Sequence, residues 1–92
     1  QKIFFFIFKQ GGDGGRIQPG HCYDYHLSVP ASAGPGKGEV SSKAWWYHSH
    51  IDEPTETNAG LLGAIIITAK GQAKPDATPK NVDKEFIAAF FI

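Results

Sequence analysis

The chain has 92 residues, enough for one small domain or part of one, and a chain of this size buries only roughly 60 to 65% of its unfolded surface on folding. Nine basic and nine acidic side chains give a formal net charge of zero, so charge argues against a nucleic-acid partner or an anionic membrane surface. The single cysteine, Cys22, cannot form an internal disulfide and lacks the Cys-x-x-Cys partner of a zinc or redox motif.

The first half of the chain alternates strand-like segments with glycine and proline turns. Residues 2–9, an apolar run over 3–8 flanked by Lys2 and Lys9, predict a strand buried on both faces, and because this run is too short to cross a bilayer, no membrane span is predicted. Residues 22–29 place apolar side chains at every second position from Tyr23 to Val29, which predicts a half-buried antiparallel strand. The proline- and glycine-rich residues 30–42 predict a loop.

The second half of the chain also alternates strand-like segments with turns, and none of its windows shows helical periodicity long enough for a long helix. The aromatic residues of 44–50 predict a third strand, with Trp45, Trp46 and Tyr47 packed in its core or at its rim. In chain order there follow a short helical turn within 51–58, a β-branched buried strand over 61–69, an exposed connector over 70–84 and a last apolar strand over 85–92. These segments predict an all-β fold.

His48 and His50 form the most informative pair in the chain. Side chains two apart on a strand point the same way, with Cα atoms about 6.6 Å apart. Neutral imidazole is a common ligand of copper, zinc, iron and nickel, so the pair suits two ligands to one metal or one ligand to each of two. A metal-free surface strand, or a mononuclear zinc site with a third ligand such as His26, fits the same local pattern.

A longer string gives the pair a context. Trp46-Tyr47-His48-Ser49-His50, then Asp52, then the strand that begins Gly60-Leu61-x-Gly63, resembles the second histidine-pair motif in the first cupredoxin domain of multicopper oxidases. That family includes laccases, ferroxidases and ceruloplasmin-like proteins. Residues 84–87 resemble the first strand of the cupredoxin domain that follows in the family.

The resemblance implies a fold and a chemistry. The fold would be a cupredoxin-like Greek-key β-sandwich, incomplete in this chain, with residues 1–70 as a partial domain, 71–84 as a connector and 85–92 as the first strand of the next domain. His48 and His50 would each bind one copper of the type 3 pair in a trinuclear cluster, with no separate catalytic residue. Such a cluster reduces dioxygen to water with electrons from a phenol or ferrous iron. The setting would be secreted or extracytoplasmic.

The family pattern is met only in part. Its trinuclear cluster takes ligands from several histidine-pair motifs across two domains, and this chain carries one, so other cupredoxin domains or chains must complete the cluster, or the activity is lost as in a catalytically silent A-type domain. His21, Cys22 and His26 resemble a type 1 copper motif, but their spacing and the lack of methionine argue against that site. Asp52 is a candidate to orient a histidine ring, although a solvated acidic surface formed with Glu53 and Glu56 is the simpler expectation.

Overall fold

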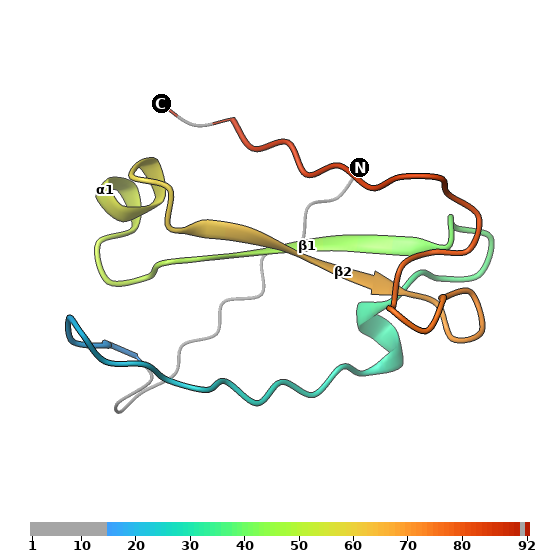
Figure 1. The fold of residues 1–92 in the computed structure, drawn as a ribbon, viewed down its shortest axis with the longest axis horizontal. Helices are drawn as coiled ribbons and strands as arrows, with labels where there is room; N and C mark the ends of the chain where they lie inside the picture. Colours follow the sequence, from blue (N-terminus) through green and yellow to red (C-terminus); the bar gives the residue numbers. More distant parts are fainter. Residues whose placement is uncertain (1–14, 91) are drawn as a thin grey trace.

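The computed structural model describes residues 15–90 and residue 92, in which a pair of antiparallel strands is the central feature (Figure 1). Strand β1 (Ser42–His48) pairs with strand β2 (Leu62–Thr68), in a register that sets Ser42 opposite Thr68 and His48 opposite Leu62. Aromatic residues in β1 and β-branched residues in β2 favour this pairing because such side chains pack well on a pleated surface. The remaining elements are short, so the all-β prediction is confirmed.

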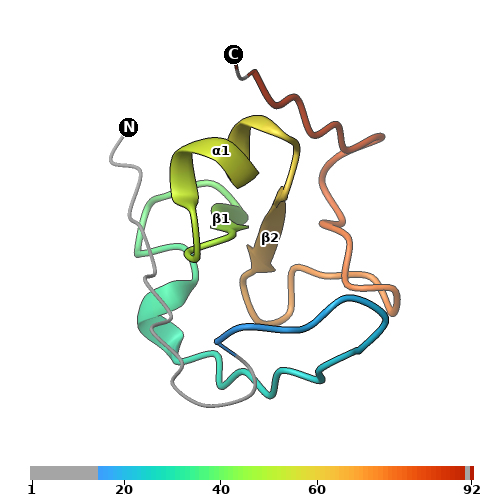
Figure 2. The same cartoon turned by 90° about the vertical axis from the view of Figure 1, so that its left-hand side faces the viewer.

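Helix α1 (Glu53–Asn58) fills the connection between the two strands and stands over one end of the pair (Figure 2). Pro54 lies in its first turn, where a missing N–H costs nothing, and Glu53 and Glu56 place negative charge at the positive end of the helix. Gly60 then takes a φ of 99°, a left-handed value that glycine adopts without strain. The predicted helical turn before Gly60 is therefore confirmed.

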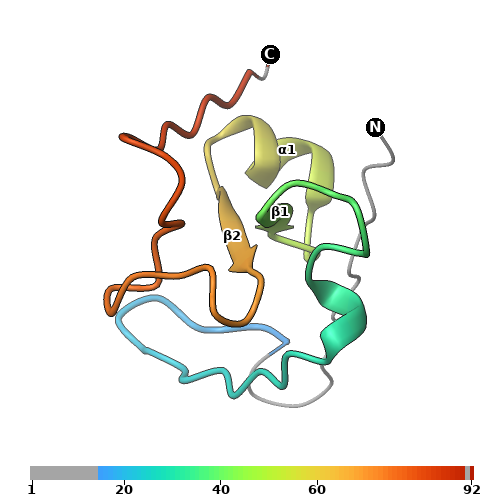
Figure 3. The same cartoon turned by 90° about the vertical axis from the view of Figure 1, so that its right-hand side faces the viewer.

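A 3-10 helix, η2 (Ala31–Ala33), lies against one side of the strand pair, and the connector that follows β2 lies on the other side (Figure 3). Ala33 and Pro79 are the buried residues of the part of the chain that the structure describes. The indole Nε1 of Trp45 donates a hydrogen bond of 2.7 Å to the Ala33 carbonyl. Trp45 thus joins the loop before β1 to the sheet, in agreement with its predicted packing role.

Replacing Trp45 with phenylalanine should loosen this loop, because the variant keeps most of the apolar surface and loses the indole donor. One lost hydrogen bond costs about 1 kcal/mol, or about fivefold faster exchange of the local amides. The readout is hydrogen exchange at the amides of Ala33 and Gly34, both bonded within η2. Val40→Ala, at a side chain that is 78% exposed, is the control and should leave these rates unchanged.

Two predicted strands are wrong as secondary structure. Residues 22–29 and 85–90 are extended and exposed, and the structure assigns neither segment to a sheet. Alternation and apolarity favour an extended backbone, but a strand also needs a neighbouring backbone to bond with. The histidine strand also ends at His48, so His50 lies beyond it, and the predicted strand over 2–9 falls outside the described residues.

The connector after β2 is a series of turns held to the open end of the strand pair. Ser41 Oγ donates to Asn81 Oδ1 at 2.7 Å, and Thr68 Oγ1 donates to the Ala77 carbonyl at 3.2 Å. The predicted exposed connector is thus present in outline, while the division of the chain at residues 70 and 84 stays a prediction. Among the described helices, none is long and apolar enough to cross a membrane.

Asp76 organises one of these turns. Its carboxylate accepts hydrogen bonds from Thr78 Oγ1 at 2.6 Å and from the Thr78 backbone N–H at 3.0 Å. These bonds, the side-chain one foremost, lower the pKa of Asp76 from its ordinary value. Because the pKa is lower in the folded state, the contribution to stability is present above the unfolded pKa and is lost as the pH falls through the folded pKa.

We therefore expect Thr78→Val to raise the pKa of Asp76 toward its ordinary value, because the hydroxyl donor is removed. An NMR titration of the Asp76 carboxyl carbon measures the change. Thr78→Ser keeps the hydroxyl and should leave the titration unchanged. An unaltered pKa in Thr78→Val would show that the side-chain bond is not the main cause.

Candidate metal centre

The two histidines lie where β1 gives way to the loop that leads into α1. His48 is the last residue of β1, and the Ser49 N–H extends the pairing by donating to the Leu61 carbonyl at 3.0 Å. His50 follows outside the strand. The two imidazole ring centroids are nevertheless 6.0 Å apart, with 37° between the ring planes. The structure therefore brings the predicted pair together, although by a loop and not by a regular strand.

His48 is held in one orientation. Its Nδ1 lies 2.8 Å from the Ser49 carbonyl oxygen, and because a carbonyl only accepts, Nδ1 carries the proton. The lone pair of the neutral ring is then on Nε2, the atom available to a metal. The ring also lies 4.6 Å from the Trp46 ring at 31°, and its side chain is only 9% exposed.

His50 is more open, with its side chain 49% exposed. The Glu53 carboxylate, at the start of α1, lies between the rings: Oε1 is 3.9 Å from His48 Nδ1 and Oε2 is 3.8 Å from His50 Nε2. At these distances, and with the Glu53 side chain 52% exposed, the attraction is weak. Glu53 adds negative charge beside the imidazoles without fixing either ring.

Ser49, between the histidines, is bonded to α1. Its Oγ donates to Glu56 Oε2, and the same carboxylate oxygen lies 3.4 Å from the Asp52 backbone N–H. Glu56 is half-buried, in contrast to the exposed Glu53. The carboxylate of α1 thus closes the loop that carries His50.

The expected solvated acidic surface is present in part, since Asp52 and Glu53 are exposed while Glu56 is half-buried. Asp52 occupies the N-cap position of α1 without a side-chain capping bond, whereas Glu53 faces the imidazoles and Glu56 bonds to Ser49. The signal for this was the proline after Glu53, which marks a helix start close enough to turn these carboxylates back toward the histidines.

The donor set of the described residues is two imidazoles. No group of three or more His, Cys, Asp or Glu side chains in the described part of the chain is placed to hold a metal ion. His26 is therefore not brought to the pair as a third zinc ligand. Imidazole nitrogen fits copper as well as zinc, so the two residues present fit part of the donor set of either metal.

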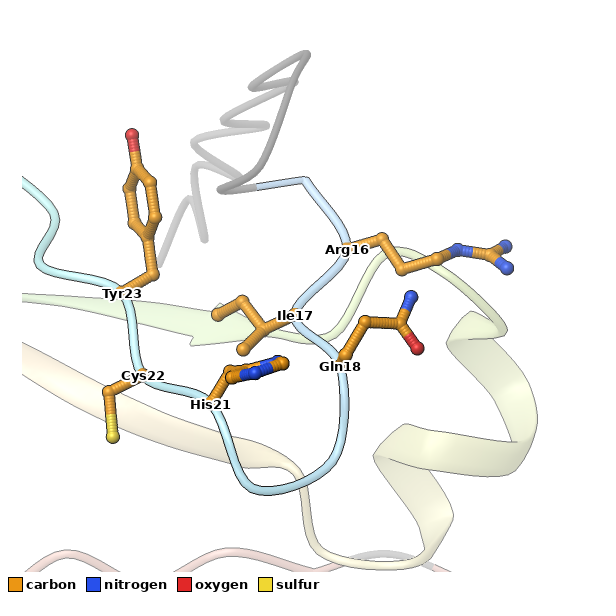
Figure 4. A pocket seen from close by; sticks show the side chains of 6 residues that line it. All are labelled: Arg16, Ile17, Gln18, His21, Cys22 and Tyr23. Atoms are coloured by element: carbon orange, nitrogen blue, oxygen red, sulfur yellow. The ribbon is translucent and has the colours of Figure 1, made fainter.

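His21 and Cys22 line a separate open pocket of about 380 Å³, formed by Arg16, Ile17, Gln18, His21, Cys22 and Tyr23. The Cys22 sulfur and the His21 ring point in different directions (Figure 4). Cys22 is an exposed free cysteine. This arrangement agrees with the sequence argument against a type 1 copper site here, which requires a histidine and a cysteine directed at one point.

Three known proteins to which this chain is similar are much longer than it is. The Homo sapiens protein named Ferroxidase HEPHL1 is 33% identical over 79 residues, which make up 86% of this chain and 7% of that protein. Homo sapiens ceruloplasmin is 34% identical over 85 residues, 92% of this chain and 8% of its own length. Mus musculus hephaestin is 32% identical over 78 residues, 83% of this chain and 7% of its own length. No family model and no solved structure matches the chain.

These similarities cover most of the chain and join it to copper-dependent oxidoreductases. The chain belongs to the multicopper oxidase family. Within that family, the relatives it resembles are named ferroxidase, ceruloplasmin and hephaestin, and the similarities give no support to a laccase-like subtype. The chain spans about 7 to 8% of the length of these relatives.

Proposed function

We propose that this chain is a copper-ligating segment of a ferroxidase-like multicopper oxidase, in which His48 and His50 each bind one copper of the type 3 pair. The remaining ligands of the trinuclear cluster come from other cupredoxin domains or chains. The observation that carries the proposal is the geometry of the pair: two imidazoles with centroids 6.0 Å apart, one of them with Nδ1 bonded to a carbonyl so that the lone pair is on Nε2.

The surroundings of the pair suit a metal ligand. The Ser49 carbonyl fixes the tautomer of His48, and the Trp46 ring keeps water from one face of that imidazole. The Glu53 carboxylate adds negative charge beside both rings, which offsets part of the charge of a cation. Bound copper would supply the electron transfer that reduces dioxygen to water; the residues of this chain supply position and charge.

Ferrous iron is the proposed electron donor in preference to a phenol, since the name ferroxidase among the relatives denotes oxidation of iron. A secreted or extracytoplasmic setting belongs to the same proposal and rests on the family resemblance. The cupredoxin placement of residues 1–70 and 85–92 is likewise proposed, because it follows from the motif order and not from the strands described above.

Metal analysis and oxygen consumption of the full-length protein test the proposal together. We expect copper in the purified protein, and oxygen uptake that is faster with ferrous iron than with a phenol. Zinc at one per chain, lowered by His26→Ala, would establish the mononuclear zinc site instead. Full-length protein without copper and without oxygen uptake would establish a catalytically silent domain.

A further inference from the structure

Ser49 is bonded through all of its polar groups, although it stands between two metal ligands and is not one itself. Its carbonyl accepts from His48 Nδ1, and its N–H donates to the Leu61 carbonyl. Its hydroxyl donates to the Glu56 carboxylate. One residue therefore links the His48 ring, strand β2 and helix α1.

Among the groups bonded to Ser49, the Glu56 carboxylate is the one that belongs to helix α1. Its Oε2 accepts from the Ser49 hydroxyl and lies 3.4 Å from the Asp52 N–H, so it spans the loop on both sides of His50. The loop lacks regular pairing after Ser49, and two side chains bond across it: the Glu56 carboxylate contacts Ser49 and the Asp52 N–H, and the Ser49 hydroxyl lies 3.5 Å from the Ile51 N–H. Hydrogen bonds to a carboxylate are about twice as strong as neutral ones.

We propose that Glu56 is a positioning residue for copper binding: through Ser49 and the Asp52 amide it fixes the loop so that the His50 ring stays beside the His48 ring. This inference rests on the proposed function, because it assumes that the histidines bind copper. Groups that orient metal ligands commonly contribute 10- to 100-fold to metal affinity.

Glu53 is the weaker candidate for this role. It is closer to the imidazoles than any other described carboxylate, yet both of its contacts are 3.8 Å or longer and its side chain is 52% exposed. A contact of that kind has little hold on ring orientation. Glu53→Gln should therefore change copper affinity much less than the loss of the Glu56 carboxylate.

Full-length protein loaded with copper, titrated with a competing chelator of known copper affinity, tests the role of Glu56. Glu56→Leu removes the acceptor and keeps good helix propensity, and Glu56→Gln keeps an acceptor oxygen without the charge. We expect Glu56→Leu to weaken copper binding roughly 10- to 100-fold, with a smaller loss in Glu56→Gln. Ser49→Ala removes the donor and should weaken copper binding similarly. The variant that combines Ser49→Ala with Glu56→Leu should bind copper as tightly as the single variant of lower affinity, because both changes remove the same hydrogen bond.

Glu39 provides a matched control. It also closes a loop, since its carboxylate accepts from the Gly36 N–H at 2.7 Å, but this loop precedes β1 at the end of the strand pair away from α1 (Figure 1). Glu39→Leu should leave copper binding unchanged. Hydrogen exchange at the β1 and β2 amides is measured in parallel. The exchange rates should stay unchanged in Glu56→Leu, because the carboxylate positions the loop and the strand pair is stable without it.

The outcomes separate the two proposals. Wild-type copper affinity in Glu56→Leu would overturn the role of Glu56 and leave the proposed function standing. Equal losses of copper affinity in Glu39→Leu and Glu56→Leu would overturn the role of Glu56. Faster amide exchange throughout β1 and β2 in Glu56→Leu would also overturn it, because the loss of affinity would then follow from a general loss of stability. If Glu56→Leu fails to fold, Ser49→Ala decides by the same criteria. Unchanged copper in His48→Ala would overturn the proposed function itself.

Discussion

Full-length protein with alanine at position 48 is expected to bind copper at this site on the order of 100-fold more weakly, or not at all. His48 would supply a ligating nitrogen, and removing a ligand costs at least as much as the 10- to 100-fold typical of groups that only orient one. The His48 side chain is 9% exposed and lies against Trp46, so its ring position is set before metal arrives. Metal analysis gives the copper content, and oxygen uptake with ferrous iron should fall with it.

Two further variants separate ligation from packing. His48→Gln keeps much of the side-chain volume and lacks the imidazole, so it should lose copper as His48→Ala does while disturbing the contact with Trp46 less. His26→Ala removes an exposed histidine from the extended segment before η2 and should keep its copper. Full copper content in both position-48 variants would exclude His48 as a ligand.

Gly63→Ala is expected to destabilise the strand pair, although glycine within a strand is usually a weak choice. Gly63 pairs with Tyr47, and the ring of Tyr47 lies across it so closely that a Cβ added to Gly63 would be 2.6 Å from Tyr47 Cε1. The ring must therefore move away from the sheet. Because Tyr47 is 57% exposed, its ring can turn toward solvent, and the cost is the lost cross-strand contact, about 0.2 to 1 kcal/mol, or up to about fivefold faster exchange of the β1 and β2 amides.

Replacing glycine with alanine should change stability in opposite directions at Gly63 and at a glycine with open space around it. At a site with room for a methyl group, replacing glycine with alanine commonly stabilises by about 0.4 to 1 kcal/mol. Gly34 is such a site: its φ is −90°, and an added Cβ would meet Ile67 Cγ2 at an ordinary 3.5 Å. Gly34→Ala is the control. In a Tyr47→Ala background the cost of Gly63→Ala should disappear, and a cost that persists there would place its cause in the backbone.

The strand pair and the helix were predictable because the residues of each element favour it locally. The β-branched residues of β2 and the aromatic residues of β1 suit a pleated sheet, and Pro54 and Gly60 mark the start and end of α1. The segment 22–29 shows the limit of the same reasoning. Its alternating side chains favour a half-buried strand, but a strand also needs a neighbouring backbone to bond with, and local pattern carries no information about that neighbour.

The metal site was predictable to a similar degree. Spacing brought His48 and His50 together, and resemblance supplied the metal, but the roles of Glu53 and Glu56 depend on where α1 places them. Helical geometry turns residues three apart toward one side, and this made Glu53 a neighbour of His50 and Glu56 a neighbour of Ser49. Such contacts follow from three-dimensional arrangement, so composition alone presented these carboxylates as surface charge.

The compact run from β1 through α1 to β2 has a kinetic consequence. The connection between β1 and β2 contains or adjoins all the groups around the pair: His48, Ser49, His50, Glu56 and Leu61. Closing this short loop therefore brings these groups together at a low entropic cost. Contacts of low sequence separation form early during folding. The loop that carries the two histidines is therefore able to form early in folding, from residues 42–68 alone.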